Sequence, residues 1–92
     1  MRPRKPHELR SALEAKGFEP QESDHTWYFL HIGGRKTDIR TKVHHHPREY
    51  DDRLLGLVAK QMRLTTRELG DFLECPLTRD GYIERMRDRG HL

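Results

Sequence analysis

The hydrophobic pattern of the chain is organised around residues 25–43, which have the alternation of a β-hairpin. Residues 25–32 are rich in aromatic and β-branched side chains, and residues 35–43 are strongly charged. Gly33 and Gly34 separate the two runs. A Gly-Gly pair favours a tight turn, because glycine adopts positive φ angles without a steric clash. The pattern therefore predicts two antiparallel strands joined by a two-residue turn.

Counting outward from this turn places Ile32 opposite Arg35 and gives the hairpin two unlike faces. One face is apolar and is expected to form the core: Tyr28, Leu30, Ile32, Ile39 and Val43. The other face pairs rings with mostly charged groups: Trp27 with Arg40, Phe29 with Asp38, His31 with Lys36, and His25 with Lys42. Rings stack on unpaired bases and cations bind phosphates, so this face suits single-stranded nucleic acid. A solvated sheet face is the alternative, because exposed aromatic and basic residues are common.

A helix and an edge strand are expected before the hairpin. Pro6 suits the first helical position and Gly17 the position just past the end, so a helix is predicted over residues 7–16. A strand over residues 18–23 follows. Pro20 marks it as an edge strand, because proline lacks the N–H group that a central strand needs.

The chain after the hairpin is predicted to be helical. Pro47 is expected to open a helix with acidic residues in its first turns, namely Glu49, Asp51 and Asp52. The apolar residues of this helix recur at helical spacing and are expected to face the sheet: Leu54, Leu55, Val58 and Met62.

Two further helices follow in the prediction. Thr65 and Glu68 have the spacing of a capping box, which predicts a helix that runs to about Leu73. Thr78 is expected to cap a last short helix, with the tail from Arg87 frayed. Together the elements predict an α+β fold.

The predicted fold is one domain with two parts. Residues 1–64 form an α-β-β-β-α core, in which a three-stranded antiparallel sheet carries its helices on one face. Residues 65–92 form a helical extension packed on or beside this core. A chain of 92 residues buries a modest core but no deep internal active-site cavity.

Charge and composition narrow the choice of partners. The net charge is +3, and residues 1–47 hold nine Lys or Arg against six acids, together with six of the seven histidines. This placement predicts a polyanionic partner at the hairpin end. No apolar run is long enough to cross a bilayer or resembles a secretory signal, and Cys75 is the single cysteine. We therefore expect no membrane association, a reducing cytoplasm and no Cys-rich zinc site.

Three short segments resemble the HicA toxins, the ribonuclease halves of HicA–HicB toxin–antitoxin pairs. They are Glu8-Leu9 at the helix start, Gly17-Phe18 at its end, and Ser23-Asp24-His25 before the second strand. The resemblance covers roughly residues 5–64. It implies a fold like that of double-stranded RNA-binding domains, cleavage of messenger RNA without metal or cofactor, and a HicB-like antitoxin partner. The family's catalytic histidine usually follows Gly-Ser; His25 matches its position, but here the sequence reads Glu-Ser-Asp-His.

The residues that fit RNA cleavage lie at one end of the hairpin. Metal-free RNA cleavage needs a base that takes the proton of the 2′-hydroxyl and an acid that protonates the leaving 5′-oxygen. Histidine suits both proton transfers, because its ordinary pKa of about 6.5 lies near working pH. We predict His25 as a general base or acid, with Lys42 opposite it and Arg40 one diagonal away to bind the scissile phosphate. His44 lies two residues after Lys42, so its side chain is expected on the same face of the strand. It is predicted as a second proton-transfer group. His31 lies too far from His25, at about 20 Å for six strand residues.

The main alternative is a non-catalytic RNA-binding module with the same fold. In either case the predicted RNA-binding residues are Trp27, Lys36, Arg40 and Lys42. A metal site at His44-His45-His46 is not predicted, because alternate residues of a strand point to opposite faces and no acid or cysteine completes the ligand set. Cys75 is expected to be a buried structural thiol.

Overall fold

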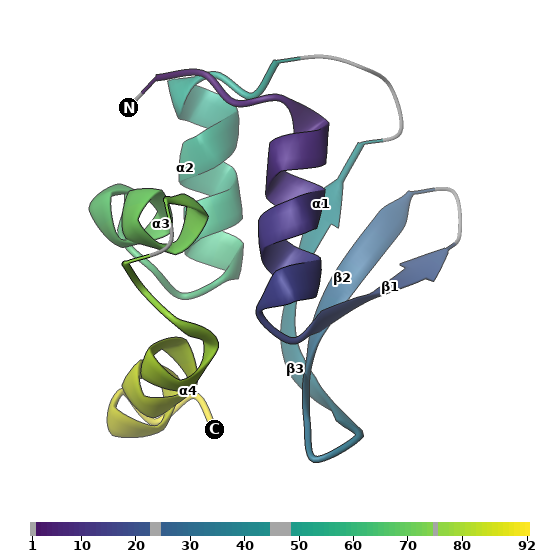
Figure 1. The fold of residues 1–92 in the computed structure, drawn as a ribbon, viewed down its shortest axis with the longest axis vertical. Coiled ribbons are helices and arrows are strands. Elements are labelled where there is room, and N and C mark those ends of the chain that lie inside the picture. Colours follow the sequence, from purple (N-terminus) through teal and green to yellow (C-terminus); the bar gives the residue numbers. More distant parts are fainter. Residues whose placement is uncertain (1, 23–24, 45–48, 75) are drawn as a thin grey trace.

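The computed structural model describes residues 2–22, 25–44, 49–74 and 76–92. Its sheet is an antiparallel meander of β1 (Phe18–Glu22), β2 (Thr26–Ile32) and β3 (Arg35–Val43), with β2 in the centre. The helices α1 (Pro6–Ala15) and α2 (Asp52–Gln61) cover one face of this sheet (Figure 1). The predicted α+β class, the three antiparallel strands and the one-sided helical layer are confirmed.

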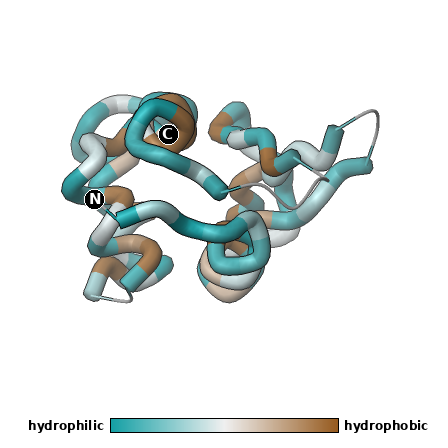
Figure 2. Tube along the Cα trace, turned by 90° about the horizontal axis from the view of Figure 1, so that it is seen from above, coloured by the Kyte–Doolittle hydropathy of each residue, from teal (hydrophilic) through white to brown (hydrophobic). Residues whose placement is uncertain are grey.

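The remaining helices extend the helical layer. α3 (Thr66–Leu73) packs against α1 and α2, and α4 (Arg79–Asp88) lies beyond α3 (Figure 1). Seen from above, hydrophobic and hydrophilic positions alternate along the helices, as helices with one buried side require (Figure 2). Among the described residues, no helix is long and apolar enough to cross a membrane.

The first helix has the ends that its sequence predicts. Pro6 occupies the first turn, and the Glu8 carboxylate accepts a hydrogen bond from the Lys5 N–H at 3.3 Å. Gly17 follows the helix with a φ of +94°, a left-handed conformation that favours glycine. The helix and β1 each lie within one residue of their predicted bounds. Residues 23 and 24, where the first strand was predicted to end, lie outside the described residues.

The hairpin keeps its predicted turn but not its full predicted register. Gly33 and Gly34 form the turn with positive φ angles, and Ile32 pairs with Arg35. The register then shifts between His31 and Phe29, so that Phe29 pairs with Arg40 rather than with Asp38. The side chain of Thr37 supports the shift: its hydroxyl donates to the carbonyl of Leu30 at 2.9 Å and accepts from the Ile39 N–H at 3.2 Å.

A shift of two residues preserves the identity of each face, because side chains alternate with a period of two. The core face remains apolar, and Tyr28, Leu30, Ile39 and Val43 are at most 3% exposed. The predicted pairs Trp27–Arg40 and His25–Lys42 are nevertheless wrong, since Trp27 pairs with Lys42.

The second helix begins later than predicted. α2 starts at Asp52, and Asp51 caps it by accepting a hydrogen bond from the Leu54 N–H at 3.0 Å. Tyr50 is held in extended backbone by a two-bond bridge to Arg4, with N–O distances of 3.1 and 2.7 Å. This pairing keeps the helix from starting earlier. Pro47 lies outside the described residues.

The helices of residues 65–92 begin where their sequence predicts. Thr65 and Glu68 form the predicted capping box of α3, and the Thr78 side chain caps α4. The prediction that the tail frays from Arg87 is wrong, because α4 continues to Asp88. Arg89, just past its end, forms an ion pair and hydrogen bonds with Glu68 of α3.

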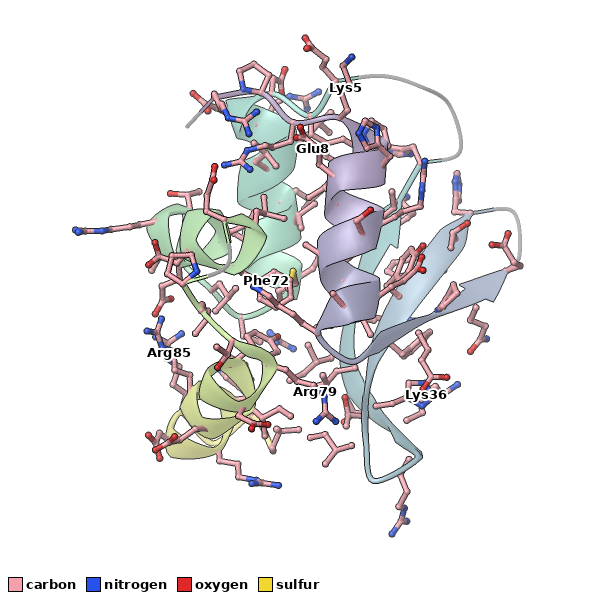
Figure 3. All side chains as sticks on the ribbon, viewed as in Figure 1. Lys5, Glu8, Lys36, Phe72, Arg79 and Arg85 are labelled. Carbon is pink, nitrogen blue, oxygen red and sulfur yellow. The ribbon has the colours of Figure 1, made fainter. Side chains whose placement is uncertain are left out.

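One hydrophobic cluster joins both parts of the chain. It includes Leu9 and Leu30 of the first part and Leu69, Phe72 and Tyr82 of the second. In Figure 3, Phe72 lies among the helices, on the side of α1 away from the sheet. The buried ammonium group of Lys16 donates to the carbonyl oxygens of Phe72 and, at 2.7 Å, of Leu77. The extension therefore shares the core of the α-β-β-β-α part.

Candidate functional site

The sheet face opposite the helices carries aromatic rings under cations. Trp27 and Phe29 of β2 are only half-buried there. The Arg40 guanidinium carbon lies 4.5 Å from the Trp27 ring centroid and 5.8 Å from that of Phe29. The Lys42 ammonium lies 5.8 Å from the Trp27 centroid. We call Trp27, Phe29, Arg40 and Lys42, with Lys36, the open face.

Lys36 lies at the hairpin end of the open face. Its ammonium stands 4.6 Å from the Phe29 ring centroid and donates a hydrogen bond to Gln21 Oε1 at 3.1 Å. Figure 3 shows it low on the sheet, far from the chain segment that carries Lys5 and Glu8. The predicted RNA-binding residues thus share one face, but Trp27 contacts Arg40 and Lys42 while Lys36 contacts Phe29.

Two histidines meet at the other end of the sheet. The ring centroids of His25 and His44 are 6.1 Å apart, and the rings are nearly perpendicular at 81°. His25 is exposed and His44 is half-buried. The register shift creates this contact: Thr26 pairs with Val43, so the residues that flank the pair, His25 and His44, come side by side.

The main chain of His44 is held from two directions. Its N–H donates to Tyr50 Oη at 2.9 Å, and its carbonyl oxygen accepts from Arg10 Nη1 of α1 at 3.4 Å. The buried Tyr50 ring also lies beside the imidazole, with centroids 5.9 Å apart. The Arg4–Tyr50 bridge fixes Tyr50 in turn, so one end of the histidine pair is anchored to the core.

A buried tyrosine connects α1 to β2 near this end. Tyr28 Oη donates to Glu14 Oε2 at 2.8 Å. Burial raises the pKa of Tyr28 well above its ordinary value, and the hydrogen bond to Glu14 adds to the effect. Tyr28 is therefore a protonated donor at neutral pH and positions α1, which supplies Arg10, against the sheet.

The structure changes the predicted role of Lys42. It lies opposite Trp27 rather than opposite His25, so the predicted His25–Lys42 pair is wrong. Lys42 instead lies two residues before His44, a spacing of about 7 Å along an extended chain. Arg40 lies two residues further from the histidines and stacks on Trp27. The cations therefore form a track that leads away from the histidine pair.

This arrangement has the parts that metal-free phosphodiester chemistry needs. Two imidazoles whose centroids are 6.1 Å apart are within reach of the same phosphodiester, and each can give or take a proton. Arg10 and Lys42 bring positive charge to the same end of the sheet, and positioned cations can stabilise a transition state that gains negative charge. Rings and cations like those of the open face can stack on bases and bind phosphates.

Some contributing residues were missed because their contacts are distant in sequence. Arg10 and Tyr50 were predicted only as helix-region residues, and no local pattern links either of them to His44. Phe29 was assigned to this face, but its stacking with Arg40 depends on the register shift. His45, His46 and Cys75 lie outside the described residues. Within the described part of the chain, no cluster of three or more His, Cys, Asp or Glu could hold a metal ion.

Comparisons with known proteins do not assign a family. No family model, curated protein or solved structure gives a significant match to this chain.

Proposed function

We propose that this protein is a metal-independent endoribonuclease that acts on messenger RNA, with His25 and His44 as its acid–base pair. The observation that carries the proposal is the contact between the two imidazoles at the end of the open face. The α-β-β-β-α order with one-sided helices supports the assignment to a fold like that of double-stranded RNA-binding domains.

The proposed reaction needs no group beyond the chain and the RNA. One imidazole takes the proton of a 2′-hydroxyl, whose oxygen attacks the adjacent phosphorus. The P–O5′ bond breaks, and the second imidazole, as imidazolium, protonates the leaving 5′-oxygen. The products are a 2′,3′-cyclic phosphate and a free 5′-hydroxyl. Two cations near His44 stabilise the transition-state charge in this proposal: Arg10, whose Nη1 donates to the His44 carbonyl oxygen, and Lys42, two residues before His44 in the chain.

The test is cleavage of a 5′-labelled RNA in the presence of EDTA. The parent should cleave and leave 2′,3′-cyclic phosphate ends, and His25→Ala and His44→Ala should each slow cleavage by about 100-fold or more. His91→Ala, which changes an exposed histidine near the C-terminus, is the matched control and should cleave like the parent. Parental rates in both site variants would refute the acid–base assignment.

The proposal extends to a biological role. A ribonuclease of the HicA type is a cytoplasmic toxin that a HicB-like antitoxin silences. Induced expression should then arrest growth and deplete messenger RNA, and His25→Ala should do neither. Co-expression of the product of a neighbouring small reading frame should restore growth. Equal toxicity of the parent and His25→Ala would separate growth arrest from the proposed chemistry.

A non-catalytic RNA-binding module is the second candidate. The observation that favours it is the cation track on the open face, where Arg40 and Lys42 lie over Trp27. Such a track is suited to binding RNA and needs no histidine. This candidate predicts stable, salt-dependent RNA binding without cleavage. The departure from Gly-Ser-His before the second strand is compatible with it.

A further inference from the structure

A groove lies where the open face meets the outer side of α2. Trp27, Asp38 and Arg40 line it from the sheet. Leu57, Lys60, Gln61 and Arg63 line it from α2 and the residues just after it. Its volume is about 400 Å³. The lining contains three cations, Arg40, Lys60 and Arg63, and one acid, Asp38. The excess of positive charge suits an anionic ligand.

The groove combines planar surfaces with exposed apolar area. The Trp27 ring carries the Arg40 guanidinium at 4.5 Å, and both a ring and a guanidinium plane accept a stacked base. Leu57 on the opposite side is 51% exposed, although it is a large hydrophobic residue. An apolar side chain between cations gains nothing from contact with water alone. It can, however, cover one of the two apolar faces of a base.

Gln61 gives the groove an oriented hydrogen-bond donor. Its Oε1 accepts from the Thr41 hydroxyl at 2.7 Å and from the Lys42 N–H at 3.3 Å. The Lys42 N–H only donates, so Oε1 must be the atom that faces β3. The Nε2 group is left with its two donors, and it has no hydrogen-bond partner within the described residues. A carbonyl oxygen of a base is a matching acceptor.

We propose that this groove binds one nucleotide of single-stranded RNA, next to the scissile phosphate. The base stacks at Trp27 and Arg40 and accepts a hydrogen bond from Gln61 Nε2, while Lys60 and Arg63 bind backbone phosphate. The placement follows the strands: Trp27 lies two residues after His25, and Lys42 two residues before His44, about 7 Å in each case. This inference rests on the proposed function, because it gives that same site its substrate contacts.

The test uses RNA that cannot be cleaved, so binding is read separately from catalysis. The probe is a fluorescein-labelled 2′-O-methyl decauridylate, whose blocked 2′-oxygen cannot attack. Anisotropy gives the affinity. Trp27 is the only tryptophan, so its emission, read with the unlabelled oligomer, reports stacking in the groove directly. We expect quenching on binding, and about 10-fold weaker binding with a shallower salt dependence for Lys60→Gln combined with Arg63→Gln.

Two further variants and a competitor peptide make the result specific to the groove. Arg53→Gln removes an exposed cation of α2 that does not line the groove and should change affinity less than 2-fold. Gln61→Glu keeps the oxygen that Thr41 and Lys42 need but removes the donors, so it should bind more weakly than the parent. A decaglutamate peptide should neither quench Trp27 nor compete well with the RNA.

Three results would overturn the groove assignment. They are RNA binding with unchanged Trp27 emission, parental affinity in the Lys60/Arg63 double variant, and decaglutamate binding as tight as RNA binding. None of them bears on the histidine pair. Cleavage of unmodified RNA by the parent but not by His25→Ala would still support the nuclease proposal. Loss of that cleavage difference would instead refute the nuclease while leaving the binding result intact.

Discussion

At the scale of single residues, Lys16 is a charged side chain that lies buried in the fold. Its side chain is buried beneath the extension, and its ammonium lies 4.7 Å from the Phe72 ring centroid besides donating to two carbonyl oxygens. Burying a charged group is costly unless hydrogen bonds compensate for the lost water. Here carbonyl groups of α3 and of the following turn provide them, so the position of residues 65–92 depends on a residue at the end of α1.

Replacement of Lys16 by methionine tests this dependence. Lys16→Met keeps the length of the side chain but leaves the Phe72 and Leu77 carbonyl groups without their donor, and we expect a loss of about 2 kcal/mol in the free energy of unfolding. Urea denaturation followed by circular dichroism measures it. Lys60→Met changes an exposed lysine of α2 and is the control. A loss below about 0.5 kcal/mol in Lys16→Met would mean that its hydrogen bonds hold the extension only weakly.

Thr37 makes hydrogen bonds that support the shifted register of the hairpin. Its hydroxyl bridges the Leu30 carbonyl and the Ile39 N–H at the position where the register shifts. Thr37→Val keeps the shape and removes both hydrogen bonds, so we expect a loss of about 1 kcal/mol in stability. Thr37→Ser retains the hydroxyl and should lose clearly less. A loss in Thr37→Ser without a loss in Thr37→Val, measured by urea denaturation, would show that the methyl group and not the hydroxyl supports the bulge.

At the scale of elements, α3 and α4 are joined by one carboxylate. Glu68 caps α3 through the Thr65 N–H at 2.9 Å, and it also pairs with Arg85 at 3.0 Å and with Arg89. The hydrogen bond from Arg89 is the main reason why the pKa of Glu68 is lowered to about 2. A carboxyl group with a lowered pKa in the folded state stabilises the fold above its ordinary pKa near 4.5.

The pH dependence of stability follows from this shift. The contribution of Glu68 is complete at neutral pH and is lost as the pH falls from about 4.5 toward 2. Glu68→Gln should be less stable than the parent at pH 6, and the difference should shrink by about 1–2 kcal/mol at pH 3, with solvent screening of the partly exposed Arg89 taken into account. Urea denaturation at the two pH values measures this. The control Glu84→Gln should show no such change, and a constant difference for Glu68→Gln would contradict the coupling.

The parts of the fold that depend on local chemistry could be predicted from the sequence. Pro6, Thr65 and Thr78 mark helix starts through interactions within a few residues, and each marks the correct helix. The start of α2 was wrong because the Arg4–Tyr50 bridge joins segments 46 residues apart, and no local pattern reports it. The register beyond Phe29 was wrong because a two-residue turn fixes only the pairs next to it.

In the candidate site, too, the features that depend on local pattern could be predicted, and those that depend on distant contacts could not. The alternation of β2 was sufficient to place Trp27 and Phe29 on one face, since a shift of two residues leaves each face unchanged. Which cation stands over which ring was not predictable, because it depends on the bulge at Thr37. His44 was predicted as a second proton-transfer group because it lies on the same face as Lys42, and the register shift places it next to His25.

At the scale of the whole molecule, the two faces of the sheet have different surroundings. The helices α1 and α2 cover one face (Figure 1) and contribute core residues such as Leu9 and Leu55. The opposite face presents rings and cations. The histidine pair lies at the end of the sheet where α1 supplies Arg10 and the chain before α2 supplies Tyr50. The proposed substrate contacts along the open face and the proposed chemistry at its end therefore involve different residues, and variants can separate them.

The pH dependence of RNA cleavage in EDTA tests the central claim most directly, when it is measured for the parent, His25→Ala and His44→Ala. If one imidazole acts as base and the other as acid, the parental rate rises and then falls with pH. Each single variant should be slower by about 100-fold or more and should lose one limb of the curve. An unchanged rate and an unchanged profile in both variants would contradict the account, because the proton transfers would then belong to other groups.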